Sequence, residues 1–433
     1  MNLIVIVTDT FRADHLGCYG NERVSTPNLD RLAEQGVVFA NCYADGLATI
    51  PARRVFYTGN SILPEAEWRP LSPGDVTVAE ILSEHDYTSG LVSDCYHQFK
   101  PNLNFHRGFD SWEWIRGQEN DRWRSGPRGA VNPRDHMPEH HWNPRYDETM
   151  RQYLLNMQDR EGEDDYICAR SCTAAMEWLD RNAQQSPFML WLELFDPHEP
   201  WDAPPRFRTM YREDYPIDDY QFGYGVNVED VCEEDYAVLR DLYAAEVTFV
   251  DERIGKLLDY VDEIGLRDDT VVVFTTDHGT HLGEDGCIQK QWRNPKSIVT
   301  QMPMIVRHPD ESFAGTRVDA LVSAMDLAPM LMRFAGVDDH PPMDGEDMWR
   351  LASGQSESLH DWLLIGFRKF AAARTPDWYY FEGLDPNDPG HGPALYDMKA
   401  DPDETTNVVD DHPEVVRELR ALISGCFPLG ESG

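Results

Sequence analysis

The fold is decided by the stretch Gly46-Leu-Ala-Thr-Ile-Pro-Ala-Arg-Arg-Val-Phe-Tyr-Thr-Gly59. Thr is a favoured N-cap and Pro is tolerated in a first helical turn, so we expect a helix to begin at Thr49. Free backbone N–H groups and the positive end of the helix dipole would then surround the Thr49 hydroxyl and bind a tetrahedral oxyanion. Arg53, one turn further, can reach back with its planar fork of donors. The alternative is that Thr49 only caps the helix and that Arg53 is an ordinary charged residue of the surface.

Two buried strands are predicted on either side of this stretch in the sequence. Residues 2–8 and 270–274 are continuous apolar, β-branched runs, as in strands buried on both faces. The first run leads to Asp9, and the second leads to Asp277 and His278. Open α/β sheets place their sites at the carboxyl ends of parallel strands. Carboxylate oxygens and an imidazole suit a divalent cation, so these three residues are candidate metal ligands. A turn or capping role is the alternative for Asp9.

Three further candidates carry positive charge or hydrogen-bond donors. His97 follows a predicted strand at 89–93, His198 follows one at 188–194, and Lys290 follows the predicted metal ligands. A metal beside a hydroxyl at a helix N-terminus would favour an alkoxide nucleophile. Together with Arg53, His198 and Lys290 could then stabilise the equatorial oxygens of a sulfuryl or phosphoryl group. Surface or loop contacts are the alternative for both residues.

Strands alternate with helices along most of the chain. This order predicts an α/β fold with a mostly parallel, doubly wound sheet. Thr26 and Pro27 are expected to begin one of the helices. The pattern of predicted elements changes near residue 350, where short strands replace the alternation of strands and helices. We therefore expect a catalytic α/β domain over 1–350 and a small α+β domain over 351–433. The predicted helices are 25–36, 76–84, 166–184, 233–265 and 413–424, and the predicted C-terminal strands are 363–367 and 378–381.

Residues 101–165 form the least regular part of the chain. They are rich in Trp, Arg, His and Pro. A lid that faces the substrate and an ordinary packed insertion are both compatible with this composition. The aromatic residues hint at a carbohydrate or aryl substrate.

The charge excludes several classes of partner. The 433 residues carry a formal net charge of −39, which disfavours nucleic acid and anionic membranes. The acidic residues are spread along the chain, which also has 12 Trp and 18 Phe, so a disordered acidic protein is excluded. The pattern predicts a halophile's protein in a high-salt cytosol. A membrane span needs about 20 apolar residues, and no such run or signal peptide is recognised, so a cytoplasmic location is expected.

Five motifs, in this order along nearly the whole chain, resemble those of the sulfatase family within the alkaline-phosphatase superfamily. Each motif alone is moderately specific, whereas five in the family's order are strongly so. They are Asp9-Thr-Phe-Arg-Ala-Asp-His-Leu-Gly-Cys-Tyr-Gly20, Thr49-Ile-Pro-Ala-Arg53 with Thr58-Gly59, Asp196-Pro-His-Glu-Pro200, Asp277-His-Gly279 with Gly283-Glu-Asp-Gly286 and Lys290, and Leu395-Tyr-Asp-Met-Lys-Ala-Asp-Pro-Asp-Glu-Thr-Thr-Asn407.

The resemblance implies a large α/β sandwich, with the site at strand carboxyl ends, and a small sheet-and-helix domain. It also implies one divalent metal ion, with calcium favoured over Mg, Mn or Zn. By position, the resemblance assigns Asp9, Asp277 and His278 as metal ligands, Thr49 as a metal-bound nucleophile, and Arg53, His198 and Lys290 as anion holders.

Position 49 departs from the family pattern. Sulfatases have Cys or Ser there, which is oxidised to formylglycine, and its hydrate attacks sulfur and later collapses to the aldehyde. Thr carries a methyl on its β-carbon and cannot give an aldehyde, so no formylglycine is expected. A Thr49 alkoxide would form a sulfo- or phospho-Thr ester that water must cleave. Related phosphatases and phosphodiesterases use an unmodified Ser or Thr in this way, which favours phosphoryl chemistry.

Two other positions depart as well. Many relatives have Asp-Asp where this chain has Asp9-Thr10, so Thr10 is a candidate weak, neutral metal ligand. The Gly-Lys-Trp-His segment of arylsulfatases corresponds to Ser93-Asp-Cys-Tyr-His97, which keeps only the histidine. Lys290 occupies a position suited to a single-metal site rather than to the two-metal phosphatases.

These observations predict a metal-dependent hydrolase that cleaves a small sulfate or phosphate ester by in-line attack of Thr49. His198 or His97 would protonate the leaving oxygen. A phosphodiesterase or phosphatase with an unmodified Thr nucleophile is the alternative. A second alternative is a non-catalytic, anion-binding pseudoenzyme, in which Thr10 and Thr49 mark a decayed site. The oligomeric state stays open.

Overall fold

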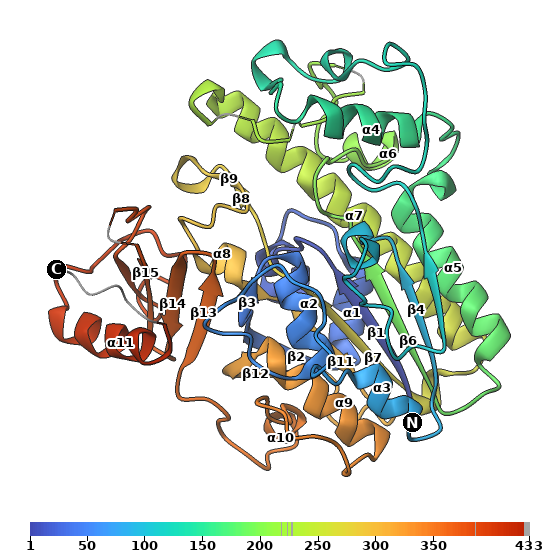
Figure 1. The fold of residues 1–433 in the computed structure, drawn as a ribbon, viewed down its shortest axis with the longest axis vertical. Coiled ribbons are helices and arrows are strands. Elements are labelled where there is room, and N and C mark those ends of the chain that lie inside the picture. Colours follow the sequence, from blue (N-terminus) through green and yellow to red (C-terminus); the bar gives the residue numbers. More distant parts are fainter. Residues whose placement is uncertain (218, 223, 227, 386, 428–433) are drawn as a thin grey trace.

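A nine-stranded mixed sheet forms the centre of the molecule (Figure 1). The structure, a computed structural model, describes residues 1–217, 219–222, 224–226, 228–385 and 387–427. The strand order is β10-β2-β11-β7-β1-β6-β4-β5, with β12 beside β2. The strands of this sheet are β1 (Asn2–Thr8), β2 (Val37–Tyr43), β4 (Thr88–Ser93), β5 (Ser111–Trp114), β6 (Phe188–Leu194), β7 (Thr270–Thr276), β10 (Gln301–Met302), β11 (Met304–Arg307) and β12 (Thr316–Ser323).

The central strand β1 runs parallel to both of its neighbours. Thr8, its last residue, pairs with Leu194 of β6 and with Thr276 of β7. All residues of the three strands are buried, as their continuous apolar runs predict. Because parallel strands in register end together, Asp9 and Asp277 leave the sheet at the same edge. The predicted α/β class with mostly parallel strands is confirmed, and β11 is an antiparallel strand within it.

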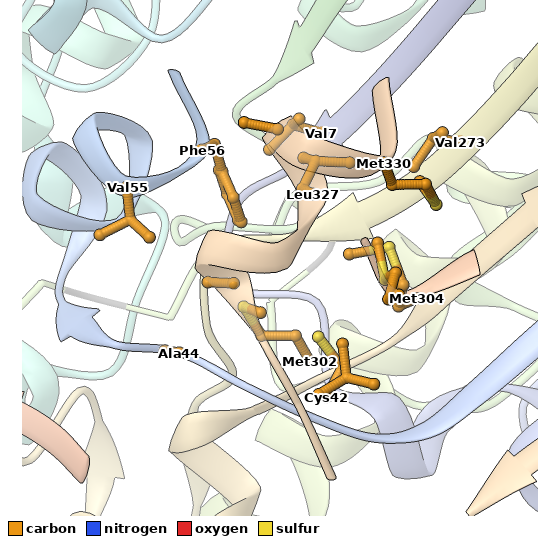
Figure 2. Close-up of a cluster of buried hydrophobic side chains, with 14 of the residues drawn as sticks. Val7, Cys42, Ala44, Val55, Phe56, Val273, Met302, Met304, Leu327 and Met330 are labelled. Atoms are coloured by element: carbon orange, nitrogen blue, oxygen red, sulfur yellow. The ribbon is translucent and has the colours of Figure 1, made fainter. Parts of the chain in front are cut away.

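Helices cover both faces of this sheet (Figure 1). Val7 belongs to a core formed with α2 and α9, whereas Ile6 belongs to a core formed with α1, α5 and α7. Figure 2 shows the first core, where Leu327 and Met330 of α9 lie against Val7 and Val273. The helices are α1 (Pro27–Glu34), α2 (Thr49–Thr58), α3 (Val78–Ser83), α4 (Asp147–Met157), α5 (Ile167–Asn182), α6 (Pro205–Arg208), α7 (Glu233–Glu263), α8 (Ser297–Thr300), α9 (Leu327–Ala335), α10 (Trp349–Ala352) and α11 (Pro413–Cys426).

The start of α1 differs in one respect from the sequence prediction. Thr26 is the N-cap residue, but its side chain makes no capping hydrogen bond. Instead, the Asp251 carboxylate of α7 accepts the backbone N–H groups of Asn28 at 3.2 Å and Leu29 at 2.8 Å. A residue 222 positions away therefore caps this helix.

A second sheet, of order β16-β15-β14-β13-β3, lies beside α11 at the C-terminal end of the chain (Figure 1). Its edge strand β3 comes from the N-terminal part, because Gly46 and Leu47 pair in parallel with Gly366 and Phe367. The residues just before Thr49 are thus anchored on this sheet. The strands are β3 (Gly46–Leu47), β13 (Leu363–Phe367), β14 (Phe370–Arg374), β15 (Trp378–Gly383) and β16 (Ala394–Asp397); β8 (His281–Leu282) and β9 (Ile288–Gln289) form a separate pair.

The segment 101–165 is mostly irregular. It contributes β5 to the sheet edge and holds α4. Across the described ranges, no helix has the length and apolar character that a membrane crossing requires. The division into domains at residue 350 stays a prediction.

Candidate active site

Thr49 is the first residue of α2, with Ala48 as the N-cap residue. Thr49 is buried and lines a cavity, and the helix is closed by Gly59, whose left-handed backbone (φ 65°) is the reason for a glycine there. One turn into the helix, Arg53 donates from Nη1 to the Thr49 carbonyl oxygen at 3.2 Å. The predicted helix start is confirmed.

The three residues predicted as metal ligands lie together. Asp9, Asp277 and His278 are fully buried, and each offers one ligand atom within 4.8 Å of the others. After His278 the backbone passes close to Ile298, and a Cβ on Gly279 would lie 2.0 Å from the Ile298 carbonyl oxygen. That close approach explains the glycine of the Asp-His-Gly sequence.

Two atoms of this cluster have no hydrogen-bond partner in the described part of the chain. They are Asp9 Oδ2 and His278 Nε2, both completely buried. His278 Nδ1 lies 2.9 Å from the Gly279 carbonyl oxygen, so Nδ1 carries the hydrogen and Nε2 keeps a free lone pair. A buried carboxylate oxygen that forms an ion pair with Arg53 but no hydrogen bond, together with a free imidazole lone pair, fits a divalent cation.

Thr10 braces two of these carboxylates. Its hydroxyl donates to Asp9 Oδ1 at 2.7 Å, and its backbone N–H donates to Asp277 Oδ1 at 3.0 Å. Its φ of 68° is rare for a β-branched residue, and the Tyr243 hydroxyl holds its carbonyl oxygen at 2.8 Å. Such strain in a fixed loop is typical of a functional site.

Arg53 connects the cluster to the start of α2. Its guanidinium forms ion pairs with Asp277, with Asp9 at 3.1 Å and with Glu193 at 3.0 Å, while Nη2 makes no hydrogen bond with the described residues. Burial acts to raise the pKa of Asp9, but the Arg53 guanidinium and, more weakly, the Lys290 ammonium help to hold that pKa well below its usual range. Burial and the neighbouring Asp9 raise the pKa of Asp277. One carboxyl is therefore held ionised while its neighbour binds a proton more readily.

Lys290 and His198 meet beside a buried glutamate. Lys290 Nζ lies 2.7 Å from His198 Nε2 and 2.8 Å from both carboxylate oxygens of Glu199. His198 Nδ1 donates to the Glu199 carbonyl oxygen at 2.7 Å, so its Nε2 accepts from the ammonium. The sequence analysis named both Lys290 and His198 as candidate anion-binding residues, and the structure places them in contact. It did not recognise Glu199, although this residue lies inside the quoted Asp196–Pro200 motif.

His97 lies between the carboxylate of Glu119 and the ammonium group of Lys100. Its Nε2 is 3.2 Å from Glu119 Oε2, and its Nδ1 is 2.9 Å from Lys100 Nζ. Burial lowers the pKa of His97, an effect that Glu119 partly opposes. The other oxygen of Glu119 lies 4.0 Å from His198 Nε2. Glu119 thus joins the two histidines predicted to act on the substrate, and no local pattern in the 101–165 segment marked it.

A cavity of about 950 Å³ opens in front of Thr49. Thr49, His97, His198 and Lys290 all line it, whereas the three candidate metal ligands are fully buried, and two of them, Asp9 and Asp277, contact Arg53 of α2. Other lining residues come from the 101–165 segment (Glu119, Asn143, Arg145, Tyr146) and from elsewhere in the chain (Trp68, Glu199, Trp292, Arg368). Part of the irregular segment is therefore a cavity wall.

The chain is similar to known hydrolases. A family model described as Sulfatase matches residues 1–337. The N-acetylglucosamine-6-O-sulfatase of Bacteroides thetaiotaomicron is 23% identical over 98% of this chain and 85% of its own length, and that organism's N-acetylgalactosamine-6-O-sulfatase is 26% identical over 98% and 92%. The crystal structure of the phosphonate monoester hydrolase of Agrobacterium radiobacter superposes with a TM-score of 0.77, at 21% identity over 98% of this chain and 95% of that one.

Proposed function

This chain belongs to the sulfatase family, and on that premise we propose that it hydrolyses a sulfate or phosphate ester by in-line attack of the unmodified Thr49 hydroxyl. One observation carries the proposal. Thr49 lies at a helix N-terminus in a cavity, and Arg53, which donates to the Thr49 carbonyl oxygen, pairs with Asp9 in the buried cluster that also holds the free lone pair of His278 Nε2. Nucleophile, charge stabiliser and cation ligands therefore form one connected site.

One divalent ion completes this site in our proposal. Asp9, Asp277 and His278 would hold it, with the Thr10 and Thr49 hydroxyls as neutral ligands. When bound, such an ion lowers the pKa of a hydroxyl and neutralises charge on the transferred group. The oxygen-rich ligand set supports calcium, as the family resemblance does, with Mg, Mn and Zn as the alternatives.

The side chains of the protein supply the remaining steps. Arg53 Nη2, the Lys290 ammonium and the free N–H groups at the start of α2 would bind the non-bridging oxygens of the ester. The Thr49 hydroxyl loses its proton to water in the cavity, and its oxygen bonds to sulfur or phosphorus as the bond to the leaving oxygen breaks. Water then cleaves the Thr49 ester, which releases the sulfate or phosphate product and restores the hydroxyl. We assign the proton for the leaving oxygen to His97 or His198, since both line the cavity and each has one ring nitrogen facing a lysine ammonium, at 2.9 Å from Lys100 and 2.7 Å from Lys290.

Acidic side chains in the cavity favour a substrate whose sulfuryl or phosphoryl group carries a single negative charge. Glu199 pairs with Lys290 through both of its oxygens, and Glu119 lies beside His97. These carboxylates offset part of the positive charge that a dianion would need. Sulfate monoesters, phosphodiesters and phosphonate monoesters carry one negative charge, so we rank them above phosphate monoesters.

The rim of the cavity supports a carbohydrate or aryl leaving group. Trp68, Tyr146 and Trp292 line it, and flat aromatic faces pack on sugar and aryl rings. The two curated relatives are sulfatases of amino sugars, which agrees with a carbohydrate ester. We further infer a halophile's high-salt cytoplasm as the setting, from the net charge of −39.

The test compares Thr49→Ala with Thr49→Ser on aryl sulfate, phosphate monoester and phosphodiester substrates, in molar KCl with a series of divalent metals. Thr49→Ala should lower kcat by at least about a thousandfold, the scale of losing a nucleophile, whereas Thr49→Ser keeps the hydroxyl and should remain active. Wild-type turnover by Thr49→Ala would rule out this mechanism. Absence of both turnover and divalent-metal binding in the wild type would favour the anion-binding pseudoenzyme.

A further inference from the structure

A second group of metal-ligating side chains lies outside the candidate active site. His140 and His141 end a short 3₁₀ turn, Glu139–His141, in the 101–165 segment. Asp235 lies in the first turn of α7. The three residues each offer one ligand atom within 4.8 Å of the others. None of the three lines the cavity in front of Thr49.

The spacing of these atoms fits a tetrahedral ion. Asp235 Oδ1 lies 3.1 Å from His141 Nε2 and 3.3 Å from His140 Nε2. Ligands bound to Zn²⁺ at about 2.0–2.1 Å in a tetrahedron lie about 3.3 Å apart. Two imidazoles with one carboxylate suit zinc better than calcium or magnesium, which prefer all-oxygen sites.

His141 gives an independent indication of a ligand. Its side chain is fully buried, yet Nε2 makes no hydrogen bond within the described residues, although it faces the Asp235 carboxylate. A buried ring nitrogen without a hydrogen bond is costly unless something binds it. A cation between His141 and Asp235 would satisfy both groups.

Two neighbours hold the proposed ligands in place. The Tyr220 hydroxyl lies 2.8 Å from His141 Nδ1 and fixes the orientation of the ring. The backbone N–H of Cys232 donates to Asp235 Oδ2 at 2.9 Å and so orients the carboxylate, whose Oδ1 faces His141 and whose Oδ2 lies 3.2 Å from His140 Nε2. Metal-binding histidines and carboxylates usually have such outer contacts, which orient them.

We propose that His140, His141 and Asp235 form a zinc site that fastens the 101–165 segment to the start of α7. Asn143, Arg145 and Tyr146 follow within five residues of His141 and line the cavity in front of Thr49. The ion would therefore stabilise a wall of the candidate active site without touching the reacting atoms. This site is separate from the cation site formed by Asp9, Asp277 and His278.

The test is zinc stoichiometry and affinity, measured on the metal-stripped full chain by competition with a chromophoric chelator. Asp277→Asn, which removes a ligand of the other site, should still bind one Zn²⁺ tightly. Adding His140→Ala to that variant should weaken binding by more than about 100-fold, because losing a ligand costs more than losing an outer contact. His140 is suited to substitution because its side chain is 47% exposed.

Two further variants complete the experiment. His136→Ala is the matched control, since His136 lies in the same segment but pairs with Asp219 at 3.0 Å, and it should leave zinc affinity unchanged. Tyr220→Phe should weaken binding about 10- to 100-fold by freeing the His141 ring. The proposal is overturned if Asp277→Asn binds no zinc tightly, or if His140→Ala binds it as well as His136→Ala does. Either result would leave the Thr49 mechanism untouched.

Discussion

At the scale of single residues, Thr49 determines the course of the proposed reaction. Its β-carbon carries a methyl group, so a covalent ester on its oxygen cannot collapse to an aldehyde and must be cleaved by water. His97 and Glu119 line the same cavity, where a base near the ester could activate that water. Their place in the cavity that Thr49 lines agrees with an unmodified nucleophile.

Glu199→Gln tests whether the charge of the cavity selects a singly charged ester. Removing the carboxylate frees the Lys290 ammonium, which both Glu199 oxygens contact at 2.8 Å. We expect the ratio of kcat/KM for a phosphate monoester to that for a phosphodiester to rise about tenfold at pH 8, equivalent to about 1.4 kcal/mol. Paired initial-rate measurements on the two substrates give this ratio.

Glu177→Gln is the matched control for that substitution. Glu177 is an exposed residue of α5 that does not line the cavity, so the same change in net charge should leave the ratio unaltered. An unchanged ratio in Glu199→Gln would contradict the proposed selection by charge.

The sequence marked the cationic side chains and the candidate metal ligands of this site, but not the acidic side chains that pair with the cations. Asp9, Asp277 and His278 follow buried strands, a position with a clear pattern. Glu193 is hidden in the apolar run of β6, and its contact with Arg53 joins residues 140 apart. A buried glutamate in such a strand has no local signal, because only the folded arrangement supplies its cationic partner.

At the scale of elements, the strands and long helices were predicted best because their patterns are local. The small sheet was predicted only in part, and β14 and β16 were missed. The sequence of β14 is Phe-Ala-Ala-Ala-Arg, and alanine favours helices over strands. Pairing with β13 and β15 overrides that preference. The two-residue strand β3 is likewise defined only by its partner β13.

The cap of α1 gives a prediction at this scale. Burial raises the pKa of Asp251 from 3.8 to about 6, despite its hydrogen bonds to α1. The folded state then holds this proton more tightly than the unfolded state, so the contribution to stability is full below pH 4 and is lost as pH rises to 6. Relative to Asp251→Asn, the free energy of unfolding of the wild type should fall by up to about 3 kcal/mol across that window.

Chemical denaturation of both proteins at pH 4, 5, 6 and 7, in the same molar salt, measures this difference. Asp251→Ala serves as the comparison that removes the cap entirely, and it should be less stable than Asp251→Asn at every pH by about 1 kcal/mol. A difference between wild type and Asp251→Asn that does not vary with pH would show that Asp251 does not titrate in this range.

At the scale of the whole molecule, the acidic surface governs the response to salt. With a net charge of −39, the negative side chains repel one another in dilute buffer. Salt screens this repulsion, because the Debye length falls from about 10 Å at 0.1 M to about 3 Å at 1 M. We expect the thermal midpoint to rise steeply with KCl up to about 1 M and to level off above that. Thermal unfolding followed by circular dichroism across a KCl series tests this, with sucrose at matched osmolality as the uncharged control. Equal stabilisation by sucrose, or highest stability in dilute buffer, would argue against adaptation to salt.

The central claim is that Thr49 itself accepts the transferred group. The most direct measurement is peptide mass mapping after rapid acid quenching of the metal-loaded enzyme with an activated aryl sulfate or phosphodiester. The account predicts that the peptide containing Thr49 gains one sulfuryl or esterified phosphoryl group, located on Thr49 by fragmentation, and that Thr49→Ala gains none. Turnover with no modified Thr49 at any quench time, or the same adduct on another residue, would contradict it.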